Sequence, residues 1–401
     1  MVVIRPSFFC VVVYIFGTAF FKNDRPLSSL HSLIVFADFN WQILRVAVGL
    51  DAAGSTGLNV LLLLAGMAVI TKGGDLFTDS AVAIARATRI PPVIVGATIV
   101  SMATTFPEFM VSLAGSLSGN PGFAVGNALG SCCCNIGLIV GSCALLKGFL
   151  AKRRGEEPGI PVSRVTLLGP GLFMLAAGSS VWLFSSFDAG GASIKPGGPP
   201  SEYGIARWQA GLLVALLVGY LAYSLRSALQ ARFEGELEAD EEEAADQEIV
   251  ANMGRVLVSF LIGAALVVLG SKLMVSNAEQ IAIEMGVPKL IIGLTVLAIG
   301  TSLPEFTISL LAVIKGHGAL GIGNIIGANV LNICWVVATC ALISPLPIQS
   351  QTVILDAPCV LLLMILLPAL AYRHERISTA SGAVLLTVYL AYMAILIGFF
   401  S

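Results

Sequence analysis

Charged side chains are scarce in this sequence. Asp, Glu, Lys and Arg make up only 11% of its 401 residues, whereas an ordinary soluble domain contains about 25%. Hydrophobic residues make up 57%, and apolar runs of about 20 residues, the length that crosses a bilayer, recur from Leu58 to the end of the chain. The short alternating segments that are typical of membrane β-barrels are missing. The composition therefore predicts an all-α polytopic membrane protein in a lipid bilayer.

The signatures of several kinds of chemistry are missing as well. The chain has no G-x-x-x-x-G-K-[ST] phosphate-binding loop, so the sequence does not support ATP-driven pumping. It shows no nucleophile–base arrangement, and we expect no enzyme, no cofactor and no nucleic-acid partner. The eight cysteines form no spaced pair with histidines, which argues against zinc. Cys132, Cys133 and Cys134 are best interpreted as small polarizable residues of a packed helix.

Hydropathy predicts ten membrane-spanning segments from Leu58 onward. Ahead of them, the 14-residue apolar run Phe8–Phe21 is short for a span and is typical of a signal-peptide core or a signal anchor. We therefore treat residues 1–55 as a separate N-terminal segment. The predicted spans are 58–84, 91–117, 121–146, 165–187, 207–229, 254–284, 288–314, 319–343, 352–372 and 379–400.

The spanning region contains two copies of one sequence at a constant offset of 197 residues. The first copy reads GATIVSMATTFPEF over Gly96–Phe109, and the second reads GLTVLAIGTSLPEF over Gly293–Phe306. Glycines outside these stretches keep the same offset, as in the pairs Gly66/Gly263 and Gly73/Gly270. A chance match would not hold one offset over so long a segment.

The repeat predicts an inverted architecture. An acidic linker, residues 231–252, separates a first repeat, 56–230, from a second repeat, 253–401, and each repeat contains five spans. Because five is an odd number, the second repeat must enter the membrane from the opposite side, as in many secondary transporters. Lysine and arginine gather in the loops after odd-numbered spans, so the positive-inside rule places those loops and the acidic linker in the cytoplasm. We expect the protein in the cell (plasma) membrane.

Glu108 and Glu305 hold the same position in the two repeats, each inside an apolar run. A carboxylate near the centre of a bilayer costs roughly 2.5–3.5 kcal/mol on insertion scales, which makes it a functional hypothesis by default. Two crossing repeats would bring the glutamates together, and two like charges at close range are unfavourable unless a cation lies between them. One Ca²⁺ or two Na⁺ would neutralise the pair.

Neutral oxygen groups surround each glutamate in the sequence. A proline precedes each one, so the carbonyl of Ala103 or Gly300 loses its helical partner and is free to line a cavity. Carboxylate, hydroxyl and carbonyl oxygens together suit hard cations such as Ca²⁺ and Na⁺. The candidate hydroxyl and amide groups are Thr104, Thr105, Ser131 and Asn135 in the first repeat, and Thr301, Ser302 and Asn332 in the second.

Other polar residues of the spans admit a structural interpretation. Asn127 and Asn324, inside the shared G-N-x-x-G stretches, are candidates either for the site or for helix–helix hydrogen bonds. The glycines of these stretches predict close helix packing. Asp75 and Asp79 are interpreted as interfacial or inter-helix groups of the first span.

These motifs resemble the calcium/cation antiporter superfamily, in particular its sodium/calcium exchanger branch. The likeness covers residues 58–400 and is most specific at ATTFPE, GTSLPE, GNALGS and GNIIGA. It implies ten helices in two inverted halves around a site midway across the membrane. It further implies that Ca²⁺ binds Glu108 and Glu305 together with the carbonyls of Thr104 and Thr301.

The same resemblance implies Na⁺ sites built from Thr105, Ser302, Ser131 and the carbonyl of Ala298. Asn135 and Asn332 would form the floor of the site. The chain departs from the family pattern at four positions. Many relatives have an aspartate at the Asn332 position, a serine at the Ala328 position, an asparagine at the Cys132 position and a small apolar residue at the Ser101 position. The site therefore keeps two carboxylates, which argues against a dependence on K⁺.

The leading hypothesis is a secondary antiporter that exchanges Ca²⁺ against Na⁺ by alternating access. A second hypothesis keeps the antiporter but replaces Na⁺ with H⁺, because both glutamates can take up protons. A passive cation channel is a third. Channels usually build their filters from symmetric rings of groups, however, whereas this chain presents one inverted pair.

Overall fold

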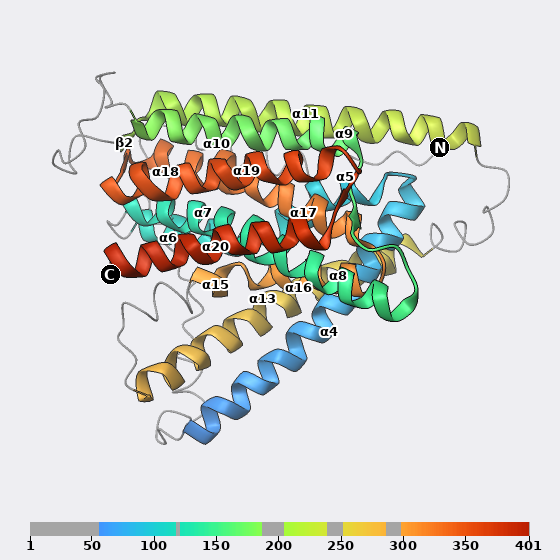
Figure 1. Cartoon of the computed structure of the whole chain (residues 1–401), viewed down its shortest axis with the longest axis horizontal. Helices are drawn as coiled ribbons and strands as arrows, with labels where there is room; N and C mark the ends of the chain where they lie inside the picture. The colour runs from blue at the N-terminus through green and yellow to red at the C-terminus, as the bar shows by residue number, and fades with distance from the viewer. Residues whose placement is uncertain (1–55, 118–120, 187–203, 239–251, 286–297, 401) are drawn as a thin grey trace. The chain divides into compact units, whose positions relative to one another are not determined.

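The computed structural model describes residues 56–117, 121–186, 204–238, 252–285 and 298–400 and is built almost wholly of helices there (Figure 1). Nine of the described helices are long and apolar enough to cross a membrane, and Leu303–Ile314 is a shorter apolar helix. The all-α prediction is confirmed. The predicted N-terminal segment, with the apolar run Phe8–Phe21, lies outside the described residues.

The helices of the first repeat follow the predicted spans. The long α11 continues to Glu238, past the predicted start of the linker at residue 231, and most of that linker lies outside the described residues. The elements are α4 (Thr56–Thr88), α5 (Pro92–Val95), the π-helix η2 (Gly96–Val100), α6 (Ser101–Leu117), α7 (Gly122–Cys133), the π-helix η3 (Cys134–Val140), α8 (Gly141–Arg154), β1 (Ile160–Pro161), α9 (Arg164–Leu168), α10 (Pro170–Ser186), β2 (Gly204–Ile205) and α11 (Arg207–Glu238).

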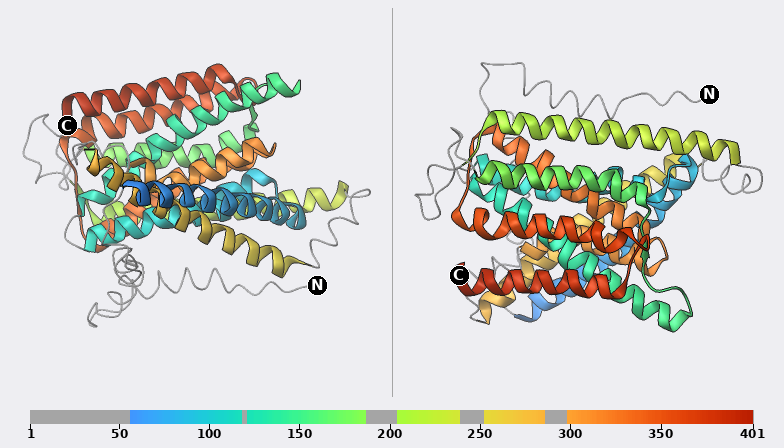
Figure 2. Two further views of the ribbon diagram at one scale, coloured as in Figure 1. Left: turned by 90° about the horizontal axis from the view of Figure 1, so that it is seen from below. Right: turned by 45° about the horizontal axis from the view of Figure 1, so that its top comes forward.

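The second repeat also matches its predicted spans, although the start of the seventh span, 288–297, lies outside the described residues. Its last two helices, α19 and α20, lie side by side (Figure 2). The elements are α13 (Met253–Glu284), α15 (Ala298–Thr301), α16 (Leu303–Ile314), α17 (Gly318–Leu331), the π-helix η6 (Asn332–Val337), α18 (Ala338–Ile343), β3 (Leu346–Pro347), the π-helix η7 (Thr352–Asp356), α19 (Ala357–Tyr372), β4 (Arg376–Ile377) and α20 (Thr379–Phe400).

The first helices of the two repeats, α4 and α13, pack along one another and are inclined to the other long helices in Figure 1. They run antiparallel, because Gly66 lies against Gly270 whereas Phe77, further along α4, stacks on Phe260 with ring centroids 4.4 Å apart. The close approach relies on glycine. A Cβ atom added to Gly270 would lie 2.6 Å from the backbone nitrogen of Ile70.

The α4–α13 contact is itself two-fold symmetric. A Cβ on Gly66 would lie 3.1 Å from the carbonyl oxygen of Gly270, and a Cβ on Gly263 would lie 3.0 Å from the carbonyl oxygen of Gly73. The two contacts are equivalent, because Gly66 corresponds to Gly263 and Gly270 corresponds to Gly73 at the repeat offset of 197 residues. Two antiparallel helices related in this way require an axis perpendicular to their length, which is the geometry of an inverted repeat.

A cluster of ion pairs ties α4 to the turn between α16 and α17. The Nζ atom of Lys315 lies 3.0 Å from Asp75 Oδ1 and 2.8 Å from Asp79 Oδ1. This contact supports the interpretation of the two aspartates as inter-helix groups. The groups are partly exposed, so the pairs contribute only about 0–1 kcal/mol each and mainly fix orientation.

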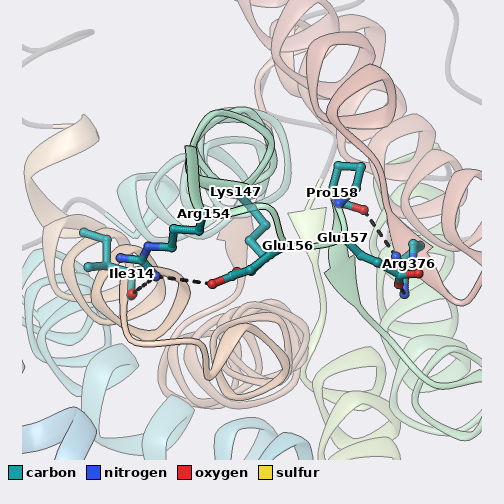
Figure 3. A network of polar contacts seen from close by, with 7 residues as sticks. All are labelled: Lys147, Arg154, Glu156, Glu157, Pro158, Ile314 and Arg376. Atoms are coloured by element: carbon teal, nitrogen blue, oxygen red, sulfur yellow. Dashed lines mark hydrogen bonds and ion pairs between the residues drawn. The ribbon is translucent and has the colours of Figure 1, made fainter. Parts of the chain in front are cut away.

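The connection between α8 and α9 is joined to the second repeat by a polar network (Figure 3). Arg154 donates a 3.4 Å hydrogen bond to the carbonyl of Ile314, and Arg376 pairs with Glu157 at 2.5 Å. Residues of β1 and β4 form a short antiparallel ladder beside this network. The hydrogen bond from Lys147 lowers the pKa of Glu156, so this carboxylate is ionised at neutral pH and its pairing is lost only under acidic conditions.

We expect Gly270→Ala to destabilise the protein by about 1–3 kcal/mol, because the new methyl group would force α4 and α13 apart. The thermal midpoint of the purified protein in detergent measures the effect. Gly254→Ala, on the same helix, is the matched control, since a Cβ there meets no described atom within 4 Å. Equal midpoints for the two variants would contradict the packing argument.

Candidate functional site

The two glutamates of the repeats lie inside the protein. Glu108 on α6 and Glu305 on α16 are both 0% exposed. The two carboxyl groups are within electrostatic reach of one another. Among the described residues, no lysine, arginine or histidine forms an ion pair with either glutamate. A pair of buried acids without a counter-charge is costly unless a cation enters or protons bind.

Threonines of the first repeat contact polar groups of the second. Thr105 Oγ1 donates to Glu305 Oε1 over 3.4 Å, and Thr104 Oγ1 donates to Asn324 Oδ1 over 3.1 Å. Asn324 is 0% exposed, so α17 brings a buried amide to the level of the TTFPE motif. The two motifs, which are far apart in the sequence, therefore share one polar centre.

The asparagines of the second shared stretches lie at the start of π-helices. Asn135 is the second residue of η3 and Asn332 is the first residue of η6. The Nδ2 atom of Asn135 donates to Asn329 Oδ1 at 3.1 Å, and the Cys132 thiol lies 3.8 Å from the carbonyl oxygen of Asn329. Because Cys132 and Asn329 are equivalent positions of the two repeats, their contact lies at the two-fold axis.

Several buried oxygens near this centre have no hydrogen-bond partner. Leaving a buried polar group unpaired costs about 1–3 kcal/mol, and a charged group costs more. A hard cation could coordinate these unpaired oxygens and so remove that cost. The unpaired oxygens are Oε1 and Oε2 of Glu108, Oε2 of Glu305, Oγ of Ser131, Oγ of Ser302, Oδ1 of Asn135 and Oδ1 of Asn332.

The donor set is poor in charged ligands. Within the described part of the chain, no group of three or more His, Cys, Asp and Glu side chains is arranged to hold a metal ion. The seven described cysteines are free and buried. A cation here would therefore depend on the two carboxylates together with hydroxyl, amide and carbonyl oxygens, which are ligands of Ca²⁺ and Na⁺ rather than of zinc.

The proline before each glutamate acts differently in the two repeats. Pro107 lies inside an unbroken α6, whereas the helix is interrupted at Ser302, and Pro304 lies in the first turn of α16. Thr301, half-buried, ends α15, and Ala298 begins it. The second, third and eighth spans each contain a π-helical segment within a continuous helix.

Two further features support the site, of which the sequence predicted one and missed the other. Glycines of α17 allow its backbone to lie on the second span: Cβ atoms on Gly323 and Gly327 would collide with the carbonyl oxygens of Val93 and Ala97. The buried Tyr220 of α11 donates to that same Ala97 carbonyl, at the π-helix η2. The G-N-x-x-G glycines signalled the close packing, but no sequence pattern pointed to the tyrosine.

Known proteins resemble the chain along most of its length. The family profile described as sodium/calcium exchanger protein matches residues 58–226 and 255–398. The inner membrane protein YrbG of Escherichia coli (strain K12) is 32% identical over 82% of this chain and 94% of its own. The sodium/calcium exchanger MaX1 of Methanosarcina acetivorans is 25% identical over 84% of this chain and 98% of its own. The structure of the sodium-calcium exchanger NCX_Mj soaked with zero Na⁺ and Ca²⁺ superposes with a TM-score of 0.67 at 26% identity, covering 85% of this chain and 100% of that chain.

A cation that enters this centre should stabilise the folded protein. At a Ca²⁺ concentration about 100 times its Kd, we expect a gain of about 2.7 kcal/mol, measured as a rise in the thermal midpoint. Glu305→Gln should abolish this gain, yet be at least as stable as the parent without added cations, because it removes a buried like charge. Glu279→Gln, at a partly exposed position of α13, should keep the full gain. A Glu305→Gln protein that Ca²⁺ still stabilises fully would rule out this site.

Proposed function

The chain belongs to the sodium/calcium exchanger family, and from this premise we propose that it exchanges Ca²⁺ for Na⁺ by alternating access around Glu108 and Glu305. One observation carries the proposal: two fully buried carboxylates, one from each repeat, lie among polar side chains of which several buried oxygens have no hydrogen-bond partner. Transport needs such a centre, because the ion must be held firmly enough to replace its hydration shell and loosely enough to leave.

The chemistry of exchange follows from charge. The two ionised carboxylates repel one another, so the empty site is unfavourable in a low-dielectric interior. One Ca²⁺, or two Na⁺, cancels both charges, and the two loads therefore compete for the same oxygens. We propose that Ca²⁺ binds the two glutamates and the carbonyls of Thr104 and Thr301. Ca²⁺ and Na⁺ are cargo in this proposal, and no resident cofactor is part of it.

Na⁺ would use the neutral part of the same donor set. The hydroxyls of Thr105, Ser302 and Ser131 are buried, and two of them, Ser302 Oγ and Ser131 Oγ, have no hydrogen-bond partner. With the carbonyl of Ala298 they form the proposed Na⁺ ligands. Asn135 and Asn332 close the floor of the site in this proposal, since both are 0% exposed and each has an unpaired amide oxygen.

Alternating access has a structural basis in the inverted repeat. The antiparallel α4 and α13 meet across a two-fold axis through glycine contacts, so an exchange of conformations between the repeats would open the site to the opposite side of the membrane. The positive-inside rule predicts a cytoplasmic position for the end of α8 that carries Lys147, Arg153 and Arg154. We propose that Ca²⁺ leaves the cell across the plasma membrane as Na⁺ enters.

Na⁺-gradient-driven uptake of ⁴⁵Ca²⁺ into everted vesicles tests the function directly. We expect uptake by the parent protein and background counts for Glu108→Gln and Glu305→Gln, because each variant lacks one of the two charges that hold the ion. Glu279→Gln serves as the expression-matched control. Full transport by either site variant would contradict the two-glutamate proposal.

Two other outcomes would favour the alternative functions. Uptake that is independent of Na⁺ and is lost when the pH gradient is removed would show that H⁺ is the coupling ion. Single-channel currents would show that the protein is a channel.

Asn332 generates a prediction about K⁺. This residue is neutral, and related potassium-dependent exchangers are expected to carry an acid near its position, so we propose that K⁺ takes no part. Replacing K⁺ by choline on both sides of proteoliposomes should leave Na⁺-driven Ca²⁺ uptake unchanged. Asn332→Asp should introduce a response to K⁺, because it adds a third carboxylate to the site. A parent protein whose uptake falls about tenfold or more without K⁺ would contradict this assignment.

A further inference from the structure

A third buried acid lies outside the proposed transport site. Asp356, where η7 joins α19, is 5% exposed. Its Oδ1 atom accepts a 3.0 Å hydrogen bond from the Tyr392 hydroxyl of α20. The Nε2 atom of Gln351 lies 3.4 Å from both carboxylate oxygens. The mechanism of exchange makes no use of this group, although a buried acid within a span is costly and calls for a function.

Within the described part of the chain, no positively charged side chain is paired with Asp356. The titratable groups that face it are Tyr392 of α20, Cys133 of α7 and Cys359 of α19. The sequence of α10, which also contacts η7, contains no titratable side chain. The ionised carboxylate thus has only neutral donors, chief among them the Tyr392 hydroxyl, against the full cost of removing a charge from water. Uptake of a proton removes that cost.

Asp356 is placed behind the transport site. The π-helix η7, which carries Asp356, contacts α7, and α19 contacts both α7 and η3. Ser131 of the proposed site lies on α7 and Asn135 lies on η3. The acid and the transport site therefore share the helix α7–η3 as a common wall. A change of charge at Asp356 acts on the site through this low-dielectric layer.

We propose that Asp356 is a proton-binding site, and that its proton opposes the binding of cations at Glu108 and Glu305. This inference rests on the proposed function, because it describes regulation of that site. Ionised Asp356 adds a negative charge behind the site and strengthens cation binding. Protonation of Asp356 removes this charge and weakens cation binding. In a medium with an effective dielectric constant of about 20, one charge changes the affinity for a divalent cation by about tenfold or more at separations up to roughly 20 Å.

The test is the apparent Ca²⁺ affinity of Na⁺-driven uptake in proteoliposomes, measured from pH 5.5 to pH 8.5 with equal pH on both sides. Asp356→Asn mimics the protonated acid and keeps an oxygen for the Tyr392 hydroxyl. We expect this variant to match the parent at low pH and to bind Ca²⁺ more weakly, by about tenfold or more, at high pH. Ionised Asp356 also favours protons at the two glutamates, so the two proteins are compared at the high-pH plateau, where the glutamates of both are ionised.

Tyr392→Phe provides a second test with a different signature. It removes the short donor to the ionised carboxylate, so protonation becomes easier and the midpoint of the pH curve should move to higher pH. Tyr389→Phe, which removes a hydroxyl from the same helix without touching the Asp356 hydrogen bond, should leave the midpoint in place. If Asp356→Asn does not fold, this pair of variants decides the question alone.

The inference is overturned if the Asp356→Asn and parent curves coincide, or if the variant is weaker by the same factor at every pH, which would indicate a packing role. An unchanged midpoint in Tyr392→Phe would overturn it as well. Failure of the proposed function looks different, since the parent protein would then show no Na⁺-driven uptake at any pH.

Discussion

Two acidic side chains, buried where the two repeats meet and without a counter-charge among the described residues, are the constraint on which the rest of this structure depends. Glu108 and Glu305 are both 0% exposed, and the protein supplies neutral hydroxyl and amide groups around them instead of a lysine or arginine. Such a centre is unfavourable when empty, because unpaired charges and dipoles in a low-dielectric interior are costly. The folded protein is therefore stabilised when a mobile cation binds at this centre. A permanent ion pair with a lysine or arginine would leave no charge for a cation to neutralise.

The fold meets this constraint through close backbone contacts. Glycines let α4 and α13 touch along their length, and other glycines let α17 lie directly on η2. Small residues at such crossings bring the polar groups of both repeats to one level of the membrane. The π-helices η3 and η6, at matching places in the repeats, turn Asn135 and Asn332 toward the protein interior, where both are 0% exposed.

The two repeats are related but not equal. The helix is interrupted at Ser302, whereas Pro107 lies inside an unbroken helix. Lys315 forms ion pairs with Asp75 and Asp79, but the equivalents of Lys315 and Asp75 in the other repeat are Ser118 and Lys272, which cannot form the same pair. Such differences give the two faces of the membrane different contacts, so the inward-open and outward-open states of an exchanger need not be equally stable.

The sequence alone determined the all-α membrane architecture, the spans and the two glutamates, because apolar length and a constant offset can be counted along one chain. It also indicated the close packing of the G-N-x-x-G glycines. Only the tertiary structure decided that Thr104 meets Asn324, that Asn135 meets Asn329 and that Asp356 meets Tyr392. The first two contacts join helices that are remote in sequence, and all three depend on how each helix is rotated about its axis. Hydropathy fixes whether a segment enters the membrane, but interhelical packing sets that rotation.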